Sequence, residues 1–151
     1  MALLELKNLK TFFATKRGTV KAVNGVSYSL DAGKVLGVVG ESGSGKSVSA
    51  MSILQLLDGN GYIDSGEILF NGVDLTKLSM NEMYKIRGNE ISVIFQEPMT
   101  SLNPVFTVSR QISEPLMIHQ GMTKKQAAAK AVELLSDVKI PNPEVVAKQY
   151  P

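Results

Sequence analysis

A regular alternation of hydrophobic and polar positions stands near the start of the chain. Val26, Tyr28 and Leu30 alternate with small polar residues, which is the period-two pattern of a half-buried strand. An Asp-Ala-Gly turn follows at residues 31–33. The short apolar run at residues 34–39, closed by a glycine, then predicts a strand that is buried on both faces, as in a parallel sheet.

Helical spacing begins directly after this run. In residues 47–57 the side chains of Met51, Leu54 and Leu57 recur at helical intervals, which predicts a helix. The Asp-Gly-Asn-Gly sequence at residues 58–61 is expected to form the turn that terminates it. Two more short strands are predicted beyond this turn, at residues 67–70 before an Asn-Gly turn and at residues 91–95.

After Pro104 the pattern changes to that of helices. Thr123, with Gln126 three residues later, has the capping-box pattern of a helix start, and Pro141 and Pro143 are expected to end that helix. The architecture is therefore α/β at the front with a helical portion behind. The predicted apolar stripe of the helix consists of Ala127, Ala131, Leu134, Leu135 and Val138.

Composition narrows the class of protein. The 151 residues, 44% hydrophobic and 20% charged, are typical of a single soluble globular domain. A net charge of +2 with scattered basic residues gives no indication of a nucleic-acid-binding surface. The absence of cysteine excludes disulfides, cysteine-ligated zinc and thiol catalysis. Because the longest apolar run is far too short to span a bilayer, any association with a membrane must come through a partner.

The strongest chemical signal lies between the predicted buried strand and the first predicted helix. Residues 40–47 have the Gly-x-x-x-x-Gly-Lys-Ser pattern of a phosphate-binding loop. Glycines let the main chain approach phosphates closely, and successive N–H groups then form an anion-binding concavity. The helix that begins at the loop adds the positive end of its dipole. The predicted nucleotide-binding residues of this segment are Gly40, Ser42, Gly43, Ser44, Gly45, Lys46, Ser47 and Val48.

Two side chains of the loop have distinct predicted roles. The ammonium group of Lys46 would reach the β- and γ-phosphates of a bound nucleotide as a catalytic group, and the Ser47 hydroxyl would ligate Mg²⁺. The alternative is a chance glycine-serine turn. The apolar strand and the periodic helix that flank the motif favour the phosphate-binding loop.

Phosphate-binding loops occur in GTPases, kinases and ATPases, so the surrounding sequence has to discriminate among them. The base-reading Asn-Lys-x-Asp motif of GTPases is absent, and the Asp-x-x-Gly match at residues 58–61 follows a helix rather than a strand. A small-molecule kinase needs arginines in a lid, and the chain has only Arg17, Arg87 and Arg110. Neither alternative gains support.

The segment Val-Ile-Phe-Gln-Glu-Pro at residues 93–98 decides among these classes. It is a predicted buried strand that ends at Gln96, and the carboxyl end of such a strand is where ligands bind in α/β sheets. Together with the phosphate-binding loop, it resembles the Q loop of ABC ATPases. Residues 37–48 and 95–104 resemble in particular the importers of oligopeptides, dipeptides and nickel. The alternative role for Gln96 is that of a glutamine capping an edge strand.

The resemblance covers essentially the whole chain and implies an α/β fold of the P-loop NTPase, ABC ATPase type. It implies an antiparallel β-subdomain at residues 1–33, a partial parallel core sheet through the Q loop at residues 34–104, and part of the helical subdomain at residues 105–151. It also implies that Gln96 is a catalytic residue that contacts Mg²⁺ or the attacking water. Adenine would stack on Phe13, with Phe12 as the alternative.

The same resemblance implies a nucleotide-binding subunit that couples ATP hydrolysis to the uptake of di- and oligopeptides. Such a subunit lies on the cytoplasmic face of the membrane. Its expected partners are transmembrane permease subunits and a second ATPase subunit in a head-to-tail dimer, with no nucleic acid. The alternatives are a non-transport ABC ATPase acting in repair or translation, and a nucleotide-binding module with no activity of its own.

Three motifs of the family do not occur in the sequence: the Leu-Ser-Gly-Gly signature, the second acidic motif and the later histidine. We therefore expect a truncated ABC ATPase that binds ATP and Mg²⁺ but does not hydrolyse ATP appreciably, because transition-state charge lacks much of its stabilisation. The absence of further parallel strands would leave unpaired edges and exposed apolar surface. Self-association of the chain is the expected consequence.

Overall fold

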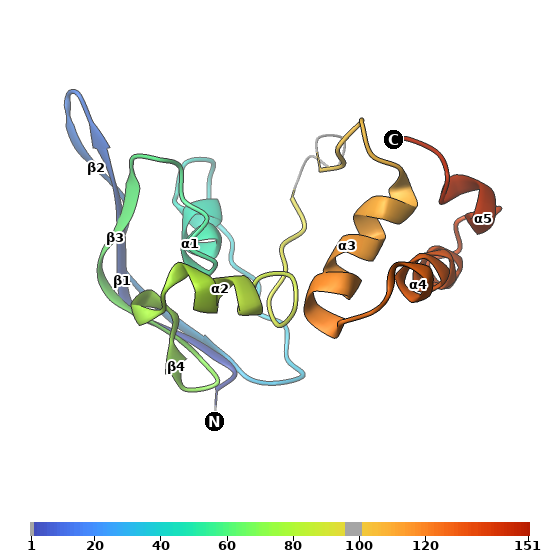
Figure 1. Ribbon diagram of the computed structural model, residues 1–151. Coiled ribbons are helices and arrows are strands. Elements are labelled where there is room, and N and C mark those ends of the chain that lie inside the picture. Colours follow the sequence, from blue (N-terminus) through green and yellow to red (C-terminus); the bar gives the residue numbers. More distant parts are fainter. Residues whose placement is uncertain (1, 96–100) are drawn as a thin grey trace. The chain divides into compact units, whose positions relative to one another are not determined.

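The structure, a computed structural model, describes residues 2–95 and 101–151. The chain forms two compact units, Met1–Tyr84 and Lys85–Pro151. The first unit contains a sheet, α1 (Lys46–Ile53) and most of α2 (Met80–Ile86), and the second contains the helices that follow (Figure 1). Each unit is described by itself below.

The sheet of the first unit has four strands in the order β2-β1-β3-β4, all antiparallel to their neighbours. A tight turn joins the last two strands, and its residues Asn71 (φ 49°) and Gly72 (φ 82°) have the left-handed backbone that two-residue hairpins favour. The predicted Asn-Gly turn and the strand containing Val26, Tyr28 and Leu30 are thus confirmed. The strands are β1 (Leu4–Thr15), β2 (Gly18–Leu30), β3 (Gly61–Phe70) and β4 (Val73–Asp74).

Helix α1 packs against β1 and β2 through small polar side chains. Thr11 of β1 and Ser52 of α1 are fully buried, and their hydroxyl oxygens lie 2.8 Å apart. The Ser52 hydroxyl donates its one proton to the carbonyl of Val48 at 2.7 Å, so Thr11 is the donor in the pair. The buried hydrophobic residues of this unit include Leu6, Leu9, Val23, Leu54 and Ile68.

Helix α1 is shorter than the sequence predicts, and a different face is buried. It ends at Ile53 because the chain turns at Gln55, whose φ of 51° is left-handed. Its buried residues are Ser49 and Ser52, whereas of the expected apolar stripe only Leu54, beyond the helix end, is buried. The Asp-Gly-Asn-Gly turn at residues 58–61 precedes β3 and does not terminate the helix.

The two strands expected in a parallel core sheet are not formed by the described residues. Residues 34–39 have no regular structure, and Val35 and Val39 are 98% and 92% exposed. In the second predicted strand, Ile91 makes only an isolated bridge to Arg87, and Ile94 is 97% exposed. A strand needs a neighbour that accepts its backbone hydrogen bonds, and apart from the bridge to Arg87 no described segment pairs with either run.

The helices of the second unit are α3 (Val108–Gln120), α4 (Lys124–Asp137) and α5 (Pro143–Val146). The predicted capping box of α4 is confirmed. The backbone N–H of Thr123 donates to Gln126 Oε1 at 2.9 Å, and the N–H of Gln126 donates to Thr123 Oγ1 at 3.4 Å.

Two details of the prediction for α4 are wrong. Ala127, Ala131 and Leu135 are buried as expected, but Val138 lies beyond the helix end and is 68% exposed. The helix stops at Asp137 without a proline. Pro143 instead begins α5, where its missing N–H costs nothing in the first turn.

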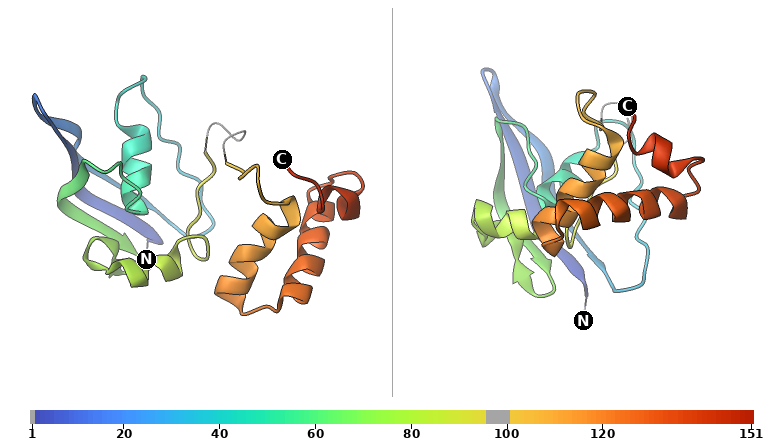
Figure 2. Two further views of the ribbon diagram at one scale, coloured as in Figure 1. Left: turned by 45° about the horizontal axis from the view of Figure 1, so that its top comes forward. Right: turned by 45° about the vertical axis from the view of Figure 1, so that its right-hand side comes forward.

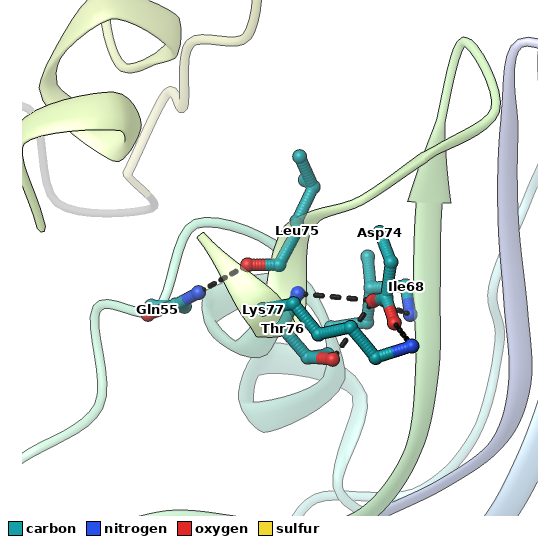
Figure 3. A network of polar contacts seen from close by, with 6 residues as sticks. All are labelled: Gln55, Ile68, Asp74, Leu75, Thr76 and Lys77. Atoms are coloured by element: carbon teal, nitrogen blue, oxygen red, sulfur yellow. Dashed lines mark hydrogen bonds and ion pairs between the residues drawn. The ribbon is translucent and has the colours of Figure 1, made fainter. Parts of the chain in front are cut away.

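The carboxylate of Asp74 organises the link from β4 to a short 3₁₀ helix, η1 (Leu75–Lys77) (Figure 3). Its Oδ1 accepts hydrogen bonds from Thr76 N at 3.1 Å and Thr76 Oγ1 at 2.8 Å, and its Oδ2 pairs with Lys77 Nζ at 2.9 Å. Burial raises the pKa of Asp74, but the hydrogen bonds from Lys77, Thr76 and the backbone outweigh it, so the pKa lies below its usual value.

We expect Asp74→Asn to lower the free energy of unfolding by about 1 kcal/mol at neutral pH, because the amide loses the ion pair and the charged cap. Because the pKa of Asp74 is lower in the folded protein than in the unfolded chain, its carboxylate stabilises the fold at pH values above the unfolded-state pKa. This contribution disappears as the pH falls through the folded-state pKa. Urea titrations at several pH values should therefore show the variant and the wild type converging in acid. Asp31→Asn, at an exposed site, is the control, and a difference that persists in acid would contradict the assignment.

Candidate functional site

The predicted phosphate-binding loop begins in the irregular segment after β2 and ends in the first turn of α1. Its turn is closed by a hydrogen bond from Ser44 N to the Glu41 carbonyl at 3.2 Å. Gly43 (φ 81°) and Gly45 (φ 89°) both have left-handed backbones, and Gly45 is the N-cap of α1. The glycines therefore allow the chain to reverse and enter the helix within a few residues.

Gly45 also lies directly against strand β2. A Cβ atom at this position would lie 2.4 Å from the carbonyl oxygen of Ala22 and 3.5 Å from Cγ2 of Val23. The first distance is far below any normal contact, and the atom in the way belongs to the backbone of a paired strand. Only glycine fits here, so the position of the loop is fixed relative to the sheet.

The side chain of Lys46 folds back across the loop. Its Nζ donates to the carbonyl oxygens of Gly40 at 2.6 Å and Glu41 at 2.7 Å, and to Ser44 Oγ at 3.3 Å. Gly40 lies tightly against the same cluster, because a Cβ there would be 2.7 Å from Ser44 Oγ. The loop thus places one ammonium group where several main-chain and hydroxyl groups converge.

The other polar groups of the loop are accessible. Ser42 and Ser47 are exposed, and Val48 is partly exposed in the first turn of α1. The first N–H groups of a helix have no partner within the helix, so those of α1 add a positive partial charge beside Lys46. Among the described residues, no group of three or more His, Cys, Asp or Glu side chains could hold a metal ion.

A cavity of about 260 Å³ adjoins the loop on the side of β2. It is lined by Tyr28 and other residues of β2, and by Val38, Gly40 and Lys46. The sequence indicated Tyr28 only as part of the apolar face of a strand. Val26 and Tyr28 alternate with small polar residues and so share one face of the strand, and this pattern was the one signal that Tyr28 faces the loop side.

The two candidate adenine-stacking residues have different surroundings. Phe12 is buried and packs edge-on against Tyr62, with ring centroids 6.3 Å apart. Phe13 is half-buried, and its ring covers Gly61, where an added Cβ would lie 2.7 Å from Phe13 Cε1. Neither residue lines the cavity beside the loop. Gln96 lies outside the described residues.

Comparison with known proteins identifies the family. The sequence profile described as ABC transporter matches residues 23–150, which is most of the chain. The chain belongs to the ABC transporter family. The α/β fold class expected from the sequence is confirmed by this match and by similar ABC cassettes of known structure.

Curated members of the ABC transporter family align with nearly all of the chain. It is 49% identical, over 99% of its length, to the oligopeptide transport ATP-binding protein AppD of Bacillus subtilis, of which it covers 46%. It is 50% identical, over 98% of its length, to the dipeptide transport ATP-binding protein DppD of Lactococcus lactis, of which it covers 43%. The chain therefore spans about half the length of these relatives.

Solved ABC cassettes share the fold at low sequence identity. A dimeric ATP-binding cassette in a post-hydrolysis state, bound to ADP and Pi, superposes with a TM-score of 0.80 at 23% identity over 98% of this chain and 61% of that one. A nucleotide-free cassette from an ABC transporter gives a TM-score of 0.65 at 23% identity over 99% and 58% of the two chains. Within the described part of the chain, no helix combines the length and the apolarity needed to cross a bilayer.

Gly43 and Gly45 allow a matched test of how the loop is held. Both have left-handed φ values, so alanine costs about 1 kcal/mol of backbone strain at either position. Only at Gly45 does the added Cβ collide with Ala22, whereas nothing lies within 4 Å at Gly43. We expect Gly45→Ala to lower the unfolding free energy of the first unit by about 3 kcal/mol or more in urea titrations. Equal losses in the two variants would contradict the contact with β2.

Proposed function

We propose that residues 40–48 bind the triphosphate of ATP. The arrangement that supports this is the convergence of the Lys46 ammonium, the left-handed glycines and the start of α1 on one short segment. On binding, Lys46 would exchange its hydrogen bonds to the carbonyls of Gly40 and Glu41 for bonds to the β- and γ-phosphate oxygens. The N–H groups of the loop and of the first turn of α1 would donate to the remaining phosphate oxygens.

The exposed hydroxyl of Ser47 fits a Mg²⁺ ligand, because hydroxyl oxygen is a hard donor and the residue follows Lys46 directly. A bound Mg²⁺ would supply charge neutralisation between the β- and γ-phosphates. Gln96 is proposed as the second ligand and as the group that contacts the attacking water. Phe13, with its half-buried ring, is the proposed platform for adenine.

At the level of the whole protein, we infer the nucleotide-binding subunit of an importer of di- or oligopeptides. Sequence identities of 49% and 50% to relatives named oligopeptide and dipeptide transport ATP-binding proteins support this inference. The inferred partners are transmembrane permease subunits and a second ATPase subunit, and the inferred location is the cytoplasmic face of the membrane. The exposed side chains of Val35, Val39 and Ile94 support self-association of this chain as well.

The direct test of nucleotide binding is calorimetric titration of the chain with Mg-ATP. We expect saturable binding that is lost in Lys46→Ala, since the variant lacks the ammonium group proposed to bind the phosphates. Lys34→Ala is the matched control, because Lys34 is exposed and lies outside the loop, and it should bind like the wild type. Binding unaffected by Lys46→Ala would show that the nucleotide binds elsewhere.

We also expect the chain to lack appreciable ATPase activity by itself. Its sequence contains no Leu-Ser-Gly-Gly run, which in the family stabilises the γ-phosphate from the opposing subunit. Phosphate release measured with Mg-ATP should therefore not exceed that of Lys46→Ala. Turnover that requires Mg²⁺ and disappears in Lys46→Ala would contradict this expectation.

A further inference from the structure

The turn at residues 58–61 leads into β3 and lies against Phe13, the proposed adenine platform. A hydrogen bond of 2.7 Å from Gly61 N to the Asp58 carbonyl closes this turn. Strand β1, which carries Phe13, lies between β2 and β3 (Figure 2). Phe13 pairs with Gly61 on one side and with Val20 of β2 on the other. The turn is therefore the immediate neighbour of Phe13 in the sheet.

Gly61 leaves free the space that the ring of Phe13 occupies. A Cβ atom at Gly61 would lie 2.7 Å from Phe13 Cε1, 3.0 Å from Leu57 Cβ and 3.2 Å from the Asp58 carbonyl oxygen. Gly61 does not have a left-handed backbone, so these contacts, rather than backbone strain, would oppose an alanine. The ring would have to move, because Cε1 is the far end of a side chain whereas the carbonyl belongs to the closed turn. The position of the ring thus depends on Gly61.

Asn60 fixes the backbone next to Phe13. Its carbonyl accepts a hydrogen bond from Ala14 N at 2.9 Å, and its side-chain Nδ2 donates to the Ala14 carbonyl at 3.0 Å. One residue therefore satisfies both backbone groups of Ala14. On the preceding side, Phe12 pairs with Tyr62. The backbone of Phe13 is consequently held before, at and after the residue.

Phe13 lies on the face of the sheet that supports the phosphate-binding loop. Its partner Val20 is two residues before Ala22, against whose carbonyl oxygen Gly45 of the loop lies. The pairing of β1 with β3 is regular from Thr11 to Phe13, so these two side chains share one face. The Thr11 hydroxyl contacts α1 on that face. Phe13 and the loop that begins α1 are therefore supported by the same side of the sheet.

We propose that Gly61 and Asn60 position the ring of Phe13 as a stacking platform for the adenine of ATP. The inference rests on the proposed binding of ATP at residues 40–48. The half-buried ring is held by the turn and keeps part of its surface accessible to a planar base. Gly61 and Asn60 are positioning residues, because they act through Phe13 rather than on the phosphates. They determine how much of the affinity for ATP comes from the base.

The test compares two ligands that share a phosphate chain and differ in the adenosine, Mg-ATP and Mg-tripolyphosphate, by calorimetric titration of the chain. We expect Phe13→Ala to weaken binding of Mg-ATP about tenfold, as loss of base stacking does, and to leave Mg-tripolyphosphate binding unchanged. Gly61→Ala should have the same selective effect, because the added Cβ displaces the ring.

Gly59→Ala is the matched control within the same turn. Nothing among the described residues lies within 4 Å of a Cβ at Gly59, so this variant should bind both ligands like the wild type. A merely structural role of Gly61 would weaken both ligands together. Equal losses for the two ligands in Gly61→Ala, or unchanged binding of Mg-ATP, would overturn the proposal.

Two further variants show whether the effects pass through the ring. Asn60→Ala loses one hydrogen bond to Ala14 and should weaken Mg-ATP about threefold, again without an effect on Mg-tripolyphosphate. The double variant Phe13→Ala/Gly61→Ala should bind Mg-ATP like Phe13→Ala alone, because Gly61 has no effect once the ring is absent. Additive losses in the double variant would overturn the proposal.

The same titrations separate a failure of the platform from a failure of the loop. If Lys46→Ala abolishes binding of both ligands while Phe13→Ala changes neither, the loop binds the phosphates and the platform is overturned. If binding of Mg-ATP depends on Phe13 and Gly61 while Lys46→Ala changes neither affinity, the platform is supported and the proposed role of the loop fails.

Discussion

The first unit depends on the close contact between the start of α1 and the backbone of β2. At Gly45 the helix approaches the strand so closely that no side chain fits between them. One helix length away, the buried hydroxyls of Thr11 and Ser52 hold the other end of α1 against β1. With both ends attached to the antiparallel sheet, the loop before the helix has a fixed anchor. The antiparallel sheet therefore provides a rigid support for the proposed ATP site on one side.

The features that the sequence predicted correctly have local causes. The Asn-Gly hairpin, the capping box of α4 and the glycine pattern of the loop each depend on the conformational preferences of a few adjacent residues. The family resemblance rested on the same kind of contiguous segment. Such local patterns can be recognised in the sequence without knowing which segments pack against them.

The features that the sequence predicted wrongly depend on distant partners. An apolar run such as residues 34–39 becomes a strand only beside another strand, and hydrophobicity alone does not say whether that neighbour is present. The buried face of α1 was missed for a related reason. Where a helix lies very close to a sheet, small residues such as Ser49 and Ser52 fill the contact, and hydrophobic periodicity does not detect them.

The central claim is that residues 40–48 bind the triphosphate of ATP while anchored on β2. The most direct measurement is amide hydrogen exchange of the chain with and without saturating Mg-ATP. The account predicts slower exchange at residues 43–48, together with slower exchange of the β2 amides around Ala22 that support the loop. Protection confined to other parts of the chain, with exchange at residues 43–48 unchanged, would contradict it.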